Sequence, residues 1–413
     1  MIVENLPVPF DRRVWSEATT LRDAGYVVSI ISPKGRGYEA SEVIIDGIHV
    51  YRHSLPREAS GPLGYLGEYG CALFWELVLA LKVAREPGFD VIHACNPPDL
   101  IFIVGLLFKA LAGKSFVFDH HDLNPELYEA KFGRRDFFWH ILLLAEKMTF
   151  RTSDVSIATN ESYRQIAMSR GKVPTDRAFT VRSGPNLDRV KRTAPDPNWR
   201  NGRRFLVGYV GVISEIEGLD LLLAAVDHIV HAKGRDDIQF VIAGAGPHWE
   251  AVRKLKSDLG LDEYVTLTGR IEDGPLFTML STADICVNPD RVTPMTNLST
   301  MNKVMEYMAL GKPIVQFDVV EGRVSAQDAS LYAAPNDPID FGEKILELID
   351  DKERRERMGE SGRRRVKDVL AWTHEQPKLL AAYEALFAER EKRTNSYGRL
   401  RGLRSRSAGR QET

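Results

Sequence analysis

Short apolar runs alternate with longer amphipathic stretches along most of this chain. Runs rich in Val, Ile and Phe, such as Ser115–Asp119 and Phe205–Val210, are typical of strands that are buried on both faces. The stretches between them repeat apolar positions at helical spacing. Alternation of strands with helices predicts parallel βαβ units, and therefore a doubly wound α/β sheet.

The same pattern occurs in both halves of the chain. In the first half the expected strands are Met1–Asn5, Tyr26–Ser32, Ile48–Arg52, Asp90–Cys95, Ser115–Asp119, Val155–Thr159 and Phe179–Val181. The helices expected there are Arg12–Ala24, Tyr65–Arg85, Pro98–Leu111, Phe137–Thr152 and Glu161–Arg170. In the second half the expected strands are Phe205–Val210, Gln239–Ala243, Val265–Leu267, Ile285–Asn288, Pro313–Phe317 and Leu331–Ala333. The helices expected there are Leu219–His231, Trp249–Leu259, Leu276–Ser281, Met301–Leu310, Pro338–Ile349 and Lys352–Leu370.

The alternation breaks between residues 186 and 203, where prolines and charged residues replace the periodicity. We therefore predict an N-terminal Rossmann-like domain over 1–185, a linker over 186–203 and a second Rossmann-like domain over 204–370. A helix over 371–388 is expected to pack back on the first domain. A basic, disordered tail is expected over 389–413, because apolar residues are few there. Two doubly wound domains place a ligand in a central cleft, at the carboxyl ends of their strands.

Composition narrows the class of protein. A length of 413 residues suits two domains, and the net charge of -2 argues against a dedicated nucleic-acid partner. The three cysteines lie in apolar runs, as reduced cytosolic thiols do. No apolar stretch reaches the ~20 residues that span a bilayer, and no secretory signal is recognisable. We therefore expect a cytoplasmic protein.

The most informative segment runs from Asp284 to Phe317. A strand, a polar loop and a helix follow one another there, and a helix N-terminus suits a phosphate or diphosphate. Ser299 or Thr300 could cap this helix or donate a hydroxyl to phosphate. Lys303 and Glu306 share one helix face, where Lys303 could neutralise a diphosphate and Glu306 could accept from ribose hydroxyls. A simple salt bridge between Lys303 and Glu306 is the alternative.

Several motifs in this order resemble family 4 glycosyltransferases, a large family of bacterial polysaccharide and glycolipid synthesis. The run Ser-Thr-Met-Asn-Lys followed by Glu-Tyr-Met-Ala-x-Gly-Lys-Pro-Ile-Val looks like the donor site of that family. The other matching segments are FDRRVWSEATTLRDAGYVVSIISP, HACNPPDL, FDHHDLNPELYE, VGYVGVISEIEGLDLLLAA, VIAGAGPHWEAVRKL and LTGRIEDGPLFTMLSTADI. The resemblance covers residues 1 to about 388.

The resemblance implies a GT-B fold and a metal-independent transfer, with retention of configuration, from a nucleotide-sugar donor to a saccharide or lipid-linked acceptor. It implies no cofactor beyond that donor. His121 would lie near the transferred sugar, with His120 as a rival for the same role. Lys303 would lie near the diphosphate and Glu306 at the ribose. The remaining donor contacts that the resemblance implies are Gly211 and Ser214 near phosphate, and Arg270 and Ile271 near the nucleobase.

Three positions depart from the family pattern. Leu298 stands where many members carry an acid that touches the donor sugar, so either Asp290 or Asn297 would make that contact, or the sugar is held differently. Val212 and Glu217 stand where members often carry two diphosphate cations. Lys303, or else Arg12 or Arg13, would then supply the missing positive charge.

Three further expectations concern partners and competing functions. The segment 131–151 mixes basic residues with Phe, Trp and Leu, which predicts either a helix at the inner face of the plasma membrane or a buried core helix. A sugar-nucleotide epimerase of the same fold is a second candidate function. A non-catalytic nucleotide-sugar-binding scaffold is a third, because of Leu298, Val212 and Glu217.

Overall fold

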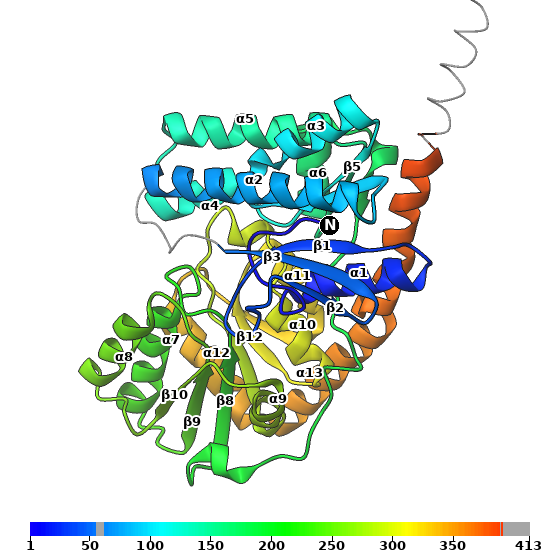
Figure 1. Cartoon of the computed structure of the whole chain (residues 1–413). Coiled ribbons are helices and arrows are strands. Elements are labelled where there is room, and N and C mark those ends of the chain that lie inside the picture. The colour runs from blue at the N-terminus through cyan, green and yellow to red at the C-terminus, as the bar shows by residue number, and fades with distance from the viewer. Residues whose placement is uncertain (55–61, 389, 391–413) are drawn as a thin grey trace, which may run out of the picture. The chain divides into compact units, whose positions relative to one another are not determined.

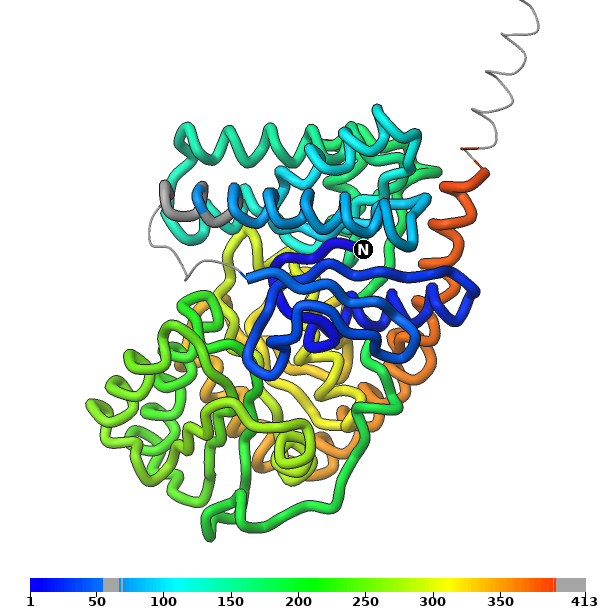
Figure 2. The backbone as a smooth tube through the Cα atoms, in the orientation of Figure 1, coloured from blue at the N-terminus to red at the C-terminus, as the bar shows by residue number. Residues whose placement is uncertain are grey.

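The computed structural model describes residues 1–54, 62–388 and 390. Its residues form two compact units, Met1–Arg182 together with Glu375 onward, and Ser183–His374. Figures 1 and 2 trace the chain through both. The segment 186–203, predicted as a linker, lies within the second unit. The predicted basic tail lies outside the described residues, apart from Arg390.

The first unit contains two groups of strands that the start of the chain connects. One sheet has the order β1-β3-β2 and the other the order β4-β5-β6-β7. Ile2 forms parallel bridges to both Ile31 in β1 and Ala94 in β4. The strands are β1 Ser29–Pro33, β2 Glu42–Ile45, β3 Ile48–His53, β4 Val91–Cys95, β5 Ser115–His120, β6 Val155–Ala158 and β7 Ala178–Thr180. The helices are α1 Arg12–Asp23, α2 Pro62–Arg85, η1 Asp99–Ile101, α3 Phe102–Ala112, α4 Asn124–Phe132, α5 Phe137–Thr152, α6 Glu161–Ser169 and η2 Thr175–Arg177.

The second unit is built on one sheet with the order β10-β9-β8-β11-β12-β13, in which every pairing is parallel. Its strands are β8 Phe205–Val210, β9 Ile238–Ala243, β10 Val265–Gly269, β11 Ile285–Asn288, β12 Ile314–Phe317 and β13 Ser330–Ala333. Its longer helices are α7 Leu219–Asp227, α8 Trp249–Asp258, α9 Asp273–Thr282, α10 Asn302–Ala309, α11 Val320–Ala326, α12 Pro338–Asp350 and α13 Lys352–Arg365. Its short helical turns are η3 Pro197–Arg200, η4 His228–Ala232, η5 Thr296–Leu298, η6 Gln327–Ala329 and η7 Val366–Leu370.

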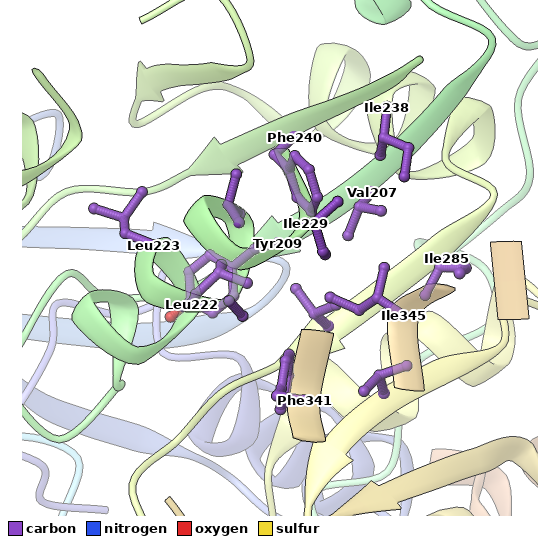
Figure 3. Packing of buried hydrophobic residues seen from close by; sticks show 14 of the residues in the cluster. Val207, Tyr209, Leu222, Leu223, Ile229, Ile238, Phe240, Ile285, Phe341 and Ile345 are labelled. Atoms are coloured by element: carbon purple, nitrogen blue, oxygen red, sulfur yellow. The ribbon is translucent and has the colours of Figure 1, made fainter. Parts of the chain in front are cut away.

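One core cluster of the second unit lies between the sheet and the helices α7 and α12, and another lies between the sheet and the helices α9 and α10. Figure 3 shows Val207 and Tyr209 of β8 and Phe240 of β9 packed with Phe341 and Ile345 of α12. Each of these side chains is almost fully buried, and burial of a large apolar side chain contributes about 1.5–3 kcal/mol. This core fixes β8 and its neighbours, and therefore the loops that leave their carboxyl ends.

The fold matches the predicted α/β class, with local differences. The predicted strand Met1–Asn5 is reduced to the bridges made by Ile2. The strand β2 was not predicted, because its residues are half exposed at a sheet edge and form no buried apolar run. The helices α4 and α11 were also not predicted, because both are short and carry charged residues among few apolar ones.

Candidate functional site

The loops after β8 and β11 diverge at the middle of the second unit's sheet. From β8 the chain passes to β9 and β10 on one side and then crosses to β11 on the other. In an open parallel sheet, the ligand crevice lies at such a switch point, outside the carboxyl ends of the strands. The loop from 211 to 218 and the loop from 289 to 301 flank this point. Most of the predicted donor residues lie on these loops or on α10, which follows.

Glycines hold these loops in close contact. A Cβ added to Gly211 would lie 2.4 Å from the Tyr209 hydroxyl, and one added to Gly218 would lie 2.0 Å from the carbonyl oxygen of Pro289. Gly218 also has a φ of 63°, which favours glycine over other residues. Gly244, after β9, would clash in the same way with the carbonyl oxygen of Gly211. Small residues are therefore required where three strand ends meet.

Lys303 lies at the centre of this junction. Its Nζ donates to Asp290 Oδ1 at 2.7 Å and forms a short ion pair with Glu217 Oε2. It also lies 3.5 Å from the Tyr209 hydroxyl and above the Tyr209 ring. Glu217, Asp290 and Lys303 come from the β8 loop, the β11 loop and α10. Lys303 therefore binds carboxylates from both loops rather than Glu306.

Burial and charge shift the pKa values in this cluster. Burial raises the pKa of Asp290 to about 7, with Lys303 opposing and Glu217 reinforcing the shift. Burial alone would lower the pKa of Lys303, but the carboxylates of Asp290 and Glu217 raise it. Burial opposes ionisation of Glu217 as well, yet Lys303 lowers its pKa. The cluster therefore holds Lys303 as a cation between an ionised Glu217 and an Asp290 whose pKa is raised by burial.

Glu306 pairs with a residue that the sequence had not suggested. Arg189 Nη2 forms a short ion pair with Glu306 Oε1, and Arg189 Nη1 donates to Asp273 Oδ2 at 3.2 Å. The Arg189 guanidinium also lies over the ring of Phe277. Arg189 was missed because it lies in the segment predicted as a linker. Its placement fixes the carboxylate of Glu306 one helical turn after Lys303.

The remaining donor candidates occupy varied positions. Ser299 Oγ donates to the Met295 carbonyl, and α10 begins at Asn302 after Met301, which makes no side-chain cap. The sequence had suggested that Ser299 or Thr300 caps α10, and the structure shows that neither residue does so. Asn297 Oδ1 accepts from Val320 N at 2.9 Å and so holds the start of α11.

Three further donor candidates lie at strand ends. Ser214 is half-buried in the β8 loop. Arg270 is exposed immediately after β10, and Ile271 next to it packs against the sheet. The ends of β8 and β10 lie on the same edge of the sheet, on either side of β9.

In the first unit, a buried ion pair fixes the ring of His121. Asp119 is the penultimate residue of β5, and Arg13 of α1 donates to both of its oxygens, at 2.7 and 3.2 Å. His121 Nε2 is bonded to Asp119 Oδ2. Arg13 Nε donates to the same nitrogen at 2.9 Å, so Nε2 contacts both members of the ion pair, and Nδ1 is used by neither contact. Burial alone would raise the pKa of Asp119, but Arg13 and His121 hold it well below its usual range.

Asn96, directly after β4, also positions the His121 loop; its segment HACNPPDL was among the family motifs, although this residue was not a named candidate. Asn96 Oδ1 accepts from His121 N at 2.7 Å, and Asn96 Nδ2 donates to the Asp122 carbonyl at 2.7 Å. The same Nδ2 donates to Asp99 Oδ1 at 2.8 Å. Both ends of the carboxamide are therefore used to hold the backbone on either side of His121.

The three other candidates of the first unit lie in different environments. His120 is fully buried among Phe118, Phe150 and Tyr163, so it belongs to the core rather than to a substrate surface. The donors of Arg13 are directed at Asp119, Glu17 and the Val181 carbonyl, so its charge is neutralised inside the unit. Arg13 is therefore unsuited to the diphosphate role considered for it. Arg12 is exposed at the start of α1.

Two groups of side chains around Asp119, buried except for the half-buried His121, have a spacing that could suit a metal ion. They are His93, Cys95 and Asp119, and Glu17, Asp119 and His121. Arg13 already neutralises Asp119, and burial raises the pKa of Cys95 well above its usual value. A metal site needs deprotonated ligands. These residues therefore fit a hydrogen-bonded network better than a metal site.

A cavity of about 620 Å³ in the first unit lies at the opposite edge of the sheet. Its lining includes Val28, directly before β1, and Val91, the first residue of β4, together with Tyr383 and Phe387 of the helical segment 372–388. Tyr383 also bonds His93 Nδ1 at 3.0 Å. His121 follows the carboxyl end of β5, so this cavity is separate from the His121 site.

The two Rossmann-like α/β units, one wholly parallel and one with an antiparallel edge pair, carry polar clusters at their strand ends, which is the arrangement of the GT-B fold. The solved structures agree on the fold. Sucrose-phosphate synthase from Thermosynechococcus elongatus superposes with a TM-score of 0.77 at 19% identity, covering 94% of this chain and 96% of that one. Anabaena HepE, solved in complex with UDP and glucose, gives a TM-score of 0.69 at 14% identity over 93% of this chain and 98% of that one.

Sequence comparison identifies the family. Residues 11–189 match the model described as Glycosyltransferase Family 4, and residues 204–351 match Glycosyl transferases group 1. Alpha-D-kanosaminyltransferase of Streptomyces kanamyceticus is 31% identical over 74% of this chain and 80% of its own length. D-inositol 3-phosphate glycosyltransferase of Thermomonospora curvata is 26% identical over 82% of this chain and 81% of its own. The chain belongs to glycosyltransferase family 4, and its activity is sugar transfer in glycoconjugate biosynthesis. The relatives do not favour an epimerase or a scaffold.

Proposed function

We propose that the Lys303 junction of the second unit binds the diphosphate of a nucleotide-sugar donor, and that the His121 site contacts the transferred sugar. The position of Lys303 at the switch point, in the first turn of α10, carries this proposal. The first backbone N–H groups of a helix have no partner within the helix and attract anions. Glu306, one turn later, would accept hydrogen bonds from the ribose.

The same groups suggest how transfer is promoted. Cleavage of the sugar–phosphate bond leaves negative charge on the departing diphosphate, which a fixed cation and fixed N–H groups stabilise. Lys303 and α10 supply such groups, which supports a metal-independent reaction. We propose a saccharide or lipid-linked acceptor and retention of configuration. Anomeric analysis of the product by NMR tests the latter, and an inverted product would exclude it.

Donor binding should stabilise the protein against heat. We expect one of UDP, GDP, ADP or TDP, or a corresponding nucleotide sugar, to raise Tm, since ligand at 100 times its Kd adds about 2.7 kcal/mol. Glu306→Ala should reduce the shift, whereas Glu250→Ala, on the exposed face of α8, should preserve it. A thermal-shift screen makes the measurement. If no nucleotide or nucleotide sugar raised Tm, the result would contradict the proposed donor site at the Lys303 junction.

We also propose peripheral binding of the first unit to an anionic membrane at the cytoplasmic face. Among the described helices, none is both long and apolar enough to cross a membrane. However, Phe137, Ile141 and Leu144 are exposed at helical spacing on one face of α5. The basic residues Arg134 and Arg135 lie directly before them. An apolar face flanked by cations suits the surface of an anionic bilayer.

Vesicle sedimentation tests this proposal. We expect the full chain to sediment with vesicles containing phosphatidylserine and to be released at high salt, since screening weakens the electrostatic part of binding. Replacing Phe137 and Leu144 by serine should weaken binding several-fold. The matched control is Ile339→Ser, an exposed apolar side chain of the second unit. Wild-type protein that stays in the supernatant at low salt would contradict the proposal.

A further inference from the structure

The donor junction contains more negative charge than a diphosphate site should tolerate. Glu217 stands where many family members carry a cation, and both Glu217 and Asp290 pair with Lys303. If both carboxylates are ionised, the junction has a net charge of about -1 by simple addition of formal charges. A diphosphate brought against Lys303 would then meet two nearby anions in a partly dry site, where repulsion is strong.

Neither carboxylate can easily turn away. Tyr209 donates its hydroxyl proton to Glu217 Oε2 at 3.0 Å. Asp290 is only 4% exposed, and the close approach of Gly218 to Pro289 fixes the loop on which it lies. Repulsion between the carboxylates and a bound diphosphate must therefore be relieved by a change of charge rather than by a movement of these side chains.

Asn288, at the end of β11, is placed to accept such a change. Its carboxamide lies 2.9 Å from Asp290 Oδ1 and 3.2 Å from Oδ2. Through its nitrogen it can donate to an ionised Asp290, and turned over it can accept through its oxygen from a protonated one. The site can therefore satisfy Asp290 in both charge states.

We propose that binding of the nucleotide-sugar donor is coupled to the uptake of one proton by Asp290, which frees Lys303 to pair with the diphosphate. This inference rests on the proposed function, and it explains how a chain with a glutamate at position 217 can bind such a donor. Asp290 is a positioning residue in this scheme, because it acts through Lys303 and needs no contact with the donor.

The charged and titratable groups around Asp290 support this assignment. Lys303 faces it from α10, Glu217 from the β8 loop and Tyr209 from β8 itself. Its pKa is already raised to about 7 by burial, so little further change is needed for protonation. A bound diphosphate repels the carboxylate and competes for Lys303, and both effects raise that pKa further. Binding should therefore be tighter at low pH and weaken as pH rises above 7.

Isothermal titration calorimetry at pH 8, in two buffers with different ionisation enthalpies, measures the proton count directly. UDP-glucose and GDP-mannose are suitable probes, because their diphosphate diesters do not titrate in this range. We expect uptake approaching one proton per donor bound, and a Kd that rises by up to tenfold per pH unit above pH 7. Binding without proton uptake would overturn the inference while leaving the proposed donor site intact.

Variants identify the group that takes up the proton. Asp290→Asn should still bind donor, with uptake near zero and a Kd that no longer depends on pH. Glu217→Gln should bind donor more tightly, with its uptake shifted to lower pH. The control Asp318→Asn, an exposed partner of Arg323, should behave as wild type. Unchanged uptake in Asp290→Asn would also overturn the inference. Absence of binding by any nucleotide sugar would instead overturn the proposed function on which it rests.

Discussion

Replacing Lys303 by alanine should lower kcat by about 10²–10³-fold, the usual effect of removing one fixed group that stabilises developing negative charge. Lys303 lies between the β8 and β11 loops and is 12% exposed, so solvent screens its charge weakly. The affinity for donor should fall as well, because the same charge acts on the bound diphosphate. Release of nucleoside diphosphate from the donor identified in the thermal-shift screen measures both effects.

A folding defect must be separated from this loss. Lys303→Ala leaves Asp290 and Glu217 facing each other without a cation, which is itself destabilising. The double variant Lys303→Met with Glu217→Gln removes that strain and should recover Tm but not activity. Lys254→Ala, on the exposed surface of α8, is the matched control and should retain wild-type kcat. Activity within threefold of wild type in the double variant would exclude Lys303 from the chemistry.

The sequence predicted the strands of the second unit well for a physical reason. Its buried parallel strands are continuous apolar runs, and β8 and β11 have the bounds that were expected. The first unit was harder, because β2 is an exposed edge and α4 has almost no apolar periodicity. The spacing of apolar residues predicts only the helices and strands that bury an apolar face, so exposed elements are missed.

The candidate site was predicted less completely than the fold. Lys303 and Glu306 were found because the loop and helix around them form a recognisable local motif. Their partners Glu217, Asp290 and Arg189 lie 13 to 117 residues away in the sequence. Such pairings depend on the strand order of the sheet, which a single sequence does not state. The same holds for Arg13 and Asp119, which are 106 residues apart.

Position 217 shows how a residue can be misinterpreted when its partner in space is not known. Glu217 in place of an expected cation was one of the three departures that suggested a non-catalytic scaffold as a candidate function. In the structure, α10 supplies the cation and Glu217 serves as one of its counter-ions. The glutamate therefore has a defined ionic partner 86 positions later in the chain.

Replacing Asp119 by asparagine should destabilise the first unit by about 3–5 kcal/mol, because Arg13 would remain as a buried cation without its main partner. Arg13 and Asp119 are 6% and 0% exposed, and two hydrogen bonds join them. Arg13 and His121 hold the pKa of Asp119 below its unfolded value. Its contribution is therefore complete above the unfolded pKa of about 4 and is lost as pH falls through the folded pKa. Urea denaturation measured from pH 7 downward should show wild type approaching the variant only in acid.

A surface pair calibrates this result within the same unit. Asp23→Asn breaks the contact of Asp23 with Arg22, which are 63% and 31% exposed, and should change stability by no more than about 0.5 kcal/mol. Removing both buried charges, with Arg13→Met and Asp119→Asn together, should cost less than the sum of the two single changes. Each single change leaves one member of the pair as an unpaired buried charge, whereas the double variant leaves neither. Additive losses would show that the pair is not coupled, and with it that Asp119 is not held ionised by Arg13 to fix the ring of His121.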